Sequence, residues 1–114
     1  MNALLDNLRR QCDGPRDGAL LRYSLGSALL DAGDAAGAVA ALERALEFDP
    51  TYSAAWKLLG KARLASGEPA SAADAWRRGI AAAGARGDKQ AEKEMTVFLR
   101  RLEKSPAPGD AAQS

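Results

Sequence analysis

The sequence matches itself when it is shifted by 34 residues, and this internal repeat is the strongest constraint on its fold. The matching positions form one block in each copy. They pair Leu25-Gly26 with Leu59-Gly60, Ala28 with Ala62, Leu30 with Leu64, Gly33 with Gly67, and Ala38, Ala41 and Arg44 with Ala72, Ala75 and Arg78. A repeat of this length is typical of architectures in which each copy buries its hydrophobic face against its neighbours.

Turn signals divide each copy into two helices. Gly33 and Gly67 suit the left-handed residue that follows a helix, and Asp34 and Glu68 place an anion where the next helix begins. Pro69 fits a first helical position, which needs no N–H donor. These signals predict two helical hairpins, 19–32 with 35–48 and 53–66 with 69–83.

Composition supports an all-α protein and narrows the chemistry. The 114 residues are 46% hydrophobic but only 5% aromatic, and alanine, the best helix former, supplies much of the apolar share. One cysteine, Cys12, and no histidine exclude an internal disulfide and argue against a structural zinc site. A net charge of +1 provides no overall basic field for nucleic acid. We therefore expect one domain without a metal or other cofactor.

Gly26 and Gly60 fall in the middle of predicted helices, where glycine costs about 1 kcal/mol relative to alanine. Such a cost is explained if a second helix must approach closely. We expect the facing residues to be small, namely Ala38, Ala45, Ala72 and Gly79.

Both copies resemble the tetratricopeptide repeat (TPR) family, whose pattern is W-x2-L-G-x2-Y, then A-x3-F, a further small residue and a proline. The second copy supplies Trp56, Leu59, Gly60, Ala72, Trp76 and Gly79, and the first supplies Leu25, Gly26, Ala38, Leu42, Ala45 and Pro50. The resemblance covers residues 19–84. It departs from the pattern at Arg22, Leu29, Arg63 and Gly84. It implies an all-α fold of antiparallel helix hairpins stacked as a short right-handed superhelix.

Both flanking segments read as end helices of this stack, which gives about six helices. Leu5, Leu8 and Cys12 are spaced for a helix over 2–13. Ala91, Met95, Phe98, and Leu102 form one stripe of a charged segment at 87–104, as in an amphipathic capping helix. The predicted single domain covers 1–104, with the N-terminal helix at 2–13, repeat one at 19–52, repeat two at 53–86 and the capping helix at 87–104. Residues 105–114 are predicted to be a disordered tail.

In stacked hairpins the first helix of each repeat lines the concave face, which solenoids use for binding. Helical spacing places the following residues there: Tyr23, Ser27, Leu30, Asp31, Lys57, Lys61 and Leu64. Lys57 and Lys61 are four apart and share one side of a helix, which favours an acidic partner. Simple solvation of both lysines is the alternative. Ser27 and Leu58 stand where family members that clamp peptide carboxylates carry asparagine, so that clamp is not carried over.

The resulting functional hypothesis is a non-enzymatic scaffold that binds a protein or peptide on the concave face. The chain lacks histidine, a phosphate-binding loop and a nucleophile motif. One alternative is a weak homodimer formed through an end helix, for which Phe98 and Leu102 should be partly exposed. Nucleic-acid binding through arginine clusters is the least favoured alternative. The sequence has no apolar run of membrane-spanning or signal-peptide length, so no membrane contact and a cytoplasmic location are expected.

Overall fold

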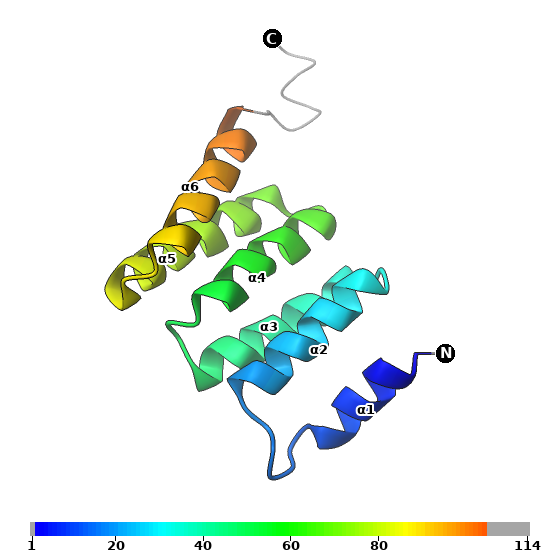
Figure 1. Cartoon of the computed structure of the whole chain (residues 1–114). Helices are drawn as coiled ribbons and strands as arrows, with labels where there is room; N and C mark the ends of the chain where they lie inside the picture. Colours follow the sequence, from blue (N-terminus) through cyan, green and yellow to red (C-terminus); the bar gives the residue numbers. More distant parts are fainter. Residues whose placement is uncertain (1, 105–114) are drawn as a thin grey trace.

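The computed structural model describes residues 2–104, which form six α-helices and no strand. The helices are α1 (Ala3–Gln11), α2 (Ala19–Asp31), α3 (Ala35–Phe48), α4 (Ser53–Ala65), α5 (Pro69–Arg86) and α6 (Lys89–Lys104). Figure 1 shows α2 with α3 and α4 with α5 as two hairpins, with α1 and α6 at opposite ends of the stack. The predicted all-α fold of stacked helix hairpins is confirmed. The predicted tail, 105–114, lies outside the described residues.

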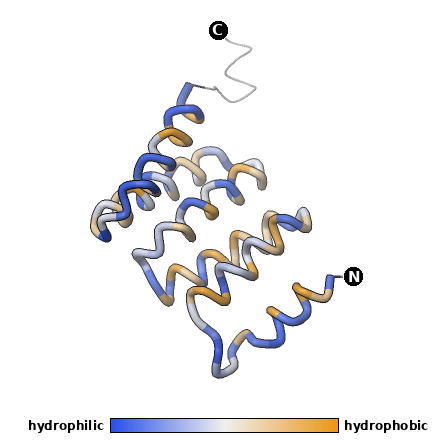
Figure 2. Tube along the Cα trace, in the orientation of Figure 1, coloured by the Kyte–Doolittle hydropathy of each residue, from blue (hydrophilic) through white to orange (hydrophobic). Residues whose placement is uncertain are grey.

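Contacts between helices arrange the stack in two layers. Each helix packs against the next one along the chain, and α4 also touches both α2 and α6. The three helices α2, α4 and α6 therefore form one layer, and α3 and α5 lie behind it (Figure 1). Among the described helices, α1 contacts only α2. Hydrophilic residues cover much of α1 and α6 (Figure 2), as the ends of a repeat stack require.

The predicted turns form as expected from their residue types. Gly33 and Gly67 have φ angles of 86° and 80°, in the left-handed region that glycine tolerates best. The N–H of Asp34 donates to the Leu29 carbonyl at 2.9 Å, and its carboxylate accepts from the Gly37 N–H at 2.9 Å. One residue thus closes α2 and caps α3.

The second hairpin is longer than predicted. We expected its second helix to end at 83, whereas α5 continues to Arg86 and ends at Gly87, which has a φ of 76°. The reason is Gly84, which stands where the family pattern has proline. Glycine keeps its N–H and has no ring, so the helix passes through this position.

The core consists of two clusters of buried side chains. The larger one includes residues from each of the helices α1 through α5, among them the fully buried Leu42 and Leu59. The smaller one joins α5 to α6 around Trp76 and Met95. Trp56 is half-buried and packs against both clusters. The N-terminal and C-terminal parts of the stack therefore share this side chain.

The mid-helix glycines do mark close approaches, but the expectation that small residues face them was largely wrong. A Cβ at Gly26 would lie 2.7 Å from Leu42 Cγ and 3.4 Å from the Ala38 carbonyl oxygen. At Gly60 the nearest neighbours are all atoms of the Trp76 indole. Each glycine thus makes room for a large buried side chain of the opposite helix, Leu42 or Trp76. The family pattern hinted at this, because Leu42 and Trp76 both occupy its aromatic position.

Candidate functional site

The layer formed by α2, α4 and α6 presents a surface that we call the first-helix face. All seven predicted binding residues lie on α2 and α4 and remain accessible to different degrees. Asp31, Lys61 and Leu64 are exposed. Tyr23, Ser27, Leu30 and Lys57 are half-buried, and among them Tyr23 and Leu30 also pack against the larger core cluster.

The two candidate lysines are engaged by α6. Lys57 Nζ lies 3.3 Å and 3.4 Å from the two carboxylate oxygens of Glu94, and Lys61 Nζ lies 4.9 Å from the centroid of the Phe98 ring. Lys57 is therefore ion-paired within the chain, whereas Lys61 is exposed to solvent and contacts one aromatic ring. Each of these interactions contributes about 1 kcal/mol or less to stability, because both are partly exposed to solvent. An incoming carboxylate has only these contacts to replace.

Two tyrosines contact each other where α2 meets the start of α4. The rings of Tyr23, on α2, and Tyr52, just before α4, have centroids 5.2 Å apart and an interplanar angle of 36°. Burial, followed by the nearby Tyr23 and Asp49, raises the pKa of the Tyr52 hydroxyl above its usual value. Sequence reasoning missed Tyr52 because it lies in a connection, where helical spacing gives no direction for its side chain.

The residues that depart from the family pattern have structural partners. Arg63 replaces a tyrosine and links three helices: its guanidinium donates to the Ser71 carbonyl at 3.1 Å and pairs with Glu43 at 3.2 Å. Arg22 replaces a tryptophan and makes two bonds to the carboxylate of Asp17, at 2.8 Å and 2.7 Å. This pair raises the pKa of Arg22 and lowers the pKa of Asp17 well below its usual range. Neither arginine is free to serve as a binding group.

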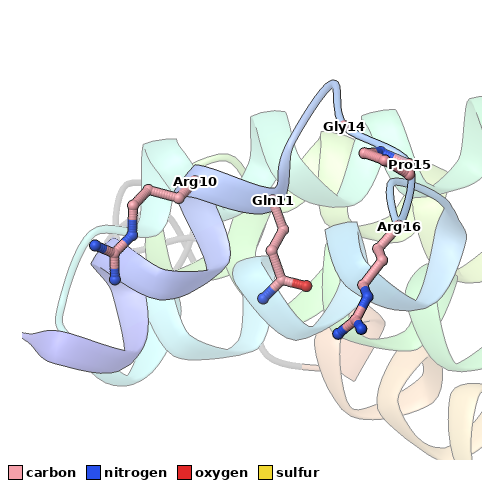
Figure 3. A pocket seen from close by; sticks show the side chains of 5 residues that line it. All are labelled: Arg10, Gln11, Gly14, Pro15 and Arg16. Atoms are coloured by element: carbon pink, nitrogen blue, oxygen red, sulfur yellow. The ribbon is translucent and has the colours of Figure 1, made fainter.

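A second polar feature lies away from the first-helix face, where α1 connects to α2. Figure 3 shows Arg10 and Gln11 at the end of α1 and Arg16 in the connection, with the Arg10 guanidinium pointing away from the other two side chains. With Gly14 and Pro15 they line a pocket of about 230 Å³. The repeat read from the sequence covered residues 19–84 and left this segment out, so the pocket was not predicted.

Some classes of site have no counterpart in residues 2–104. No group of three histidine, cysteine, aspartate or glutamate side chains there has the geometry to hold a metal ion. None of the helices described is both long and apolar enough to cross a membrane.

Comparison with known proteins agrees with the packing of α2 to α5. The chain matches the tetratricopeptide repeat over residues 29–87, and a second form of the same repeat over residues 3–53. The chain belongs to the tetratricopeptide repeat family. TPR domains generally mediate protein–protein interactions and are typically non-enzymatic scaffolds.

Relatives of similar length share the TPR fold. A TPR repeat-containing protein of Pseudomonas aeruginosa is 54% identical over 102 residues, which cover 90% of this chain and 97% of that protein. A Bordetella parapertussis protein of known solution structure is 44% identical, with a TM-score of 0.78 over 91% of this chain and 90% of that one. The solution structure of a TPR domain protein from Salinibacter ruber is 26% identical, with a TM-score of 0.74 over 82% and 94% of the two chains.

Proposed function

We propose that this TPR protein is a non-enzymatic scaffold that binds an acidic protein or peptide segment on its first-helix face. The observation that carries the proposal is the pair Lys57 and Lys61, which are held over α6 by one partly exposed ion pair and one cation–π contact. A ligand carboxylate would replace Glu94 on Lys57 at little cost, because both states contain the same kind of ion pair. The exposed Leu64, three residues after Lys61 on α4, and the half-buried Leu30 on α2 would add apolar contact. A cytoplasmic location stays a prediction.

The test is an affinity pull-down in which wild type is compared with Lys57→Glu/Lys61→Glu. We expect the variant to lose the proteins that wild type retains, because its carboxylates would repel an acidic segment. Arg44→Glu/Arg78→Glu is the matched control, since it makes the same charge change on two exposed side chains of α3 and α5 in the other layer. The proposal fails if both variants retain the same partners as wild type, or if both lose them equally.

A homodimer formed through α6 is the second candidate. As the sequence predicted, Phe98 and Leu102 are partly exposed, and Val97 beside them is 42% exposed. Part of this surface is already used, because the Phe98 ring packs on Trp76 at 5.5 Å. Sedimentation of wild type and Val97→Asp distinguishes the two candidates. A dimer in wild type that Val97→Asp converts to a monomer would favour self-association, whereas a monomer at all concentrations excludes it.

A further inference from the structure

The start of α6 is fixed against α4, and this places Glu94 opposite Lys57. The buried Ser53 hydroxyl, at the first position of α4, donates to one carboxylate oxygen of Asp88 at 2.6 Å, and the other oxygen caps the first turn of α6 at 3.1 Å. The Trp76 indole N–H donates to the Lys57 carbonyl at 3.1 Å. The backbones of both residues are thus held in place, so their side chains form an ion pair between two fixed helices.

The two lysines of the first-helix face differ in how far their charge is compensated. Lys57 Nζ lies 3.3 Å and 3.4 Å from the two Glu94 oxygens, and these side chains are only 26% and 36% exposed. Lys61 is exposed, has the Phe98 ring as its neighbour, and makes no ion pair with a carboxylate of residues 2–104. Within the described part of the chain, the lysine pair therefore offers a ligand one uncompensated positive charge instead of two.

We propose that Glu94 is a specificity-determining residue of the first-helix face, because it keeps Lys57 from adding to the affinity for an acidic ligand. A ligand carboxylate that takes Lys57 replaces an existing ion pair and leaves the Glu94 charge beside it, so the exchange yields no net attraction. A carboxylate that reaches Lys61 forms a new ion pair. The ligand class is therefore a segment in which one acidic side chain is recognised, not a run of them. This inference rests on the function proposed above for the first-helix face.

Removal of the Glu94 charge should convert the face into one that prefers two carboxylates. Residues four apart on a helix have Cβ atoms about 5–6 Å apart, so Lys57 and Lys61 then present two neighbouring charges. Alternate residues of an extended peptide lie on one side about 7 Å apart, so such a peptide can place one carboxylate on each lysine.

The test is a ¹⁵N NMR titration of the full chain at low salt with two peptides that have blocked ends, Gly-Glu-Leu-Glu-Gly and Gly-Glu-Leu-Gln-Gly. We expect saturable shifts on α4, and wild type should bind the two peptides within about twofold of each other. Glu94→Gln should bind the two-carboxylate peptide about fivefold more tightly than wild type does, and should prefer it to the one-carboxylate peptide.

Glu103→Gln is the matched control, because it removes a carboxylate from the same helix and breaks an ion pair of 3.5 Å with Arg77 in the other layer. It should bind both peptides as wild type does. The urea midpoint of Glu94→Gln should stay close to that of wild type. If Glu94 served only to dock α6, its loss would lower this midpoint and change the binding of both peptides alike.

The outcomes separate this inference from the function on which it rests. The proposed function fails, and the inference with it, if neither wild type nor Glu94→Gln shows saturable shifts, or if Lys57→Glu/Lys61→Glu binds the peptides as wild type does. The inference alone is overturned if the lysine variant loses binding while Glu94→Gln matches wild type with both peptides. Equal tightening of both peptides, or the same tightening by Glu103→Gln, also overturns it, because the effect would then reflect overall charge.

Discussion

At the residue scale, the same amino acid has opposite roles at two places in the second hairpin. Gly60 lies where an added Cβ would overlap the Trp76 indole, whose N–H donates to the Lys57 carbonyl at 3.1 Å. Gly84 is exposed on α5, and an added Cβ would find its nearest neighbour, Glu92 Oε2, at an ordinary 3.7 Å. Both glycines are helical, so helix propensity favours alanine equally at both.

We therefore predict that Gly60→Ala destabilises the protein and Gly84→Ala stabilises it. Alanine gains about 0.5–1 kcal/mol in helix propensity at either position. At Gly60 the overlap costs about 1–3 kcal/mol and displaces the indole from its hydrogen bond, so the loss exceeds the gain. Urea unfolding of the two variants and wild type measures both changes. A stabilised Gly60→Ala variant would mean that Trp76 moves aside freely.

At the element scale, the sequence predicted the bounds of those helices that end at residues typical of turns. The α3 bounds were predicted in full, and α2 and α4 end one residue before the predicted 32 and 66, because Gly33 and Gly67 impose their stops. The end of α5 was predicted too early because the family pattern stops this helix at a proline, and Gly84 stands at that position. The ion pair of Lys57 with Glu94 spans 37 residues between a repeat and a helix that is no copy of it, so no internal offset predicted it.

The α1–α2 connection should make stability depend on acid through Asp17. Arg22 lowers the folded pKa of this carboxyl well below the value of about 3.9 expected in the unfolded chain. A lowered folded pKa contributes stability that is fully present above the unfolded pKa and is lost as pH falls below it. We predict that Asp17→Asn unfolds at lower urea concentration than wild type at pH 7, and that this difference shrinks as pH falls below about 4.

Urea midpoints measured at several pH values check this prediction for the α1–α2 connection. Asp31→Asn serves as the control, because Asp31 is exposed and forms no ion pair within residues 2–104. It should leave the midpoint unchanged at every pH. A constant difference between Asp17→Asn and wild type down to pH 2 would show that the lost stability is steric and not due to the charge.

At the scale of the whole molecule, the stack is held unevenly along its length. The larger core cluster is centred on the two hairpins, and the smaller one ties α6 to α5. Within residues 2–104 the first helix, α1, touches only α2, and Leu5 is its one buried side chain. In a repeat stack each unit is stabilised by its neighbours, so a helix with one neighbour opens at a lower free energy than the rest.

We predict that native-state hydrogen exchange shows α1 opening independently of α3 and α4, which carry the fully buried Leu42 and Leu59. Leu5→Ala should speed exchange in α1 and along α2 while leaving α4 and α5 protected, because it removes the contact that docks α1. Leu4→Ala is the adjacent control, since Leu4 is 57% exposed and its loss should change exchange little. If Leu5→Ala instead lowered protection equally in all six helices, α1 would be part of one cooperative unit. The pocket at its end would then open only when the whole stack unfolds.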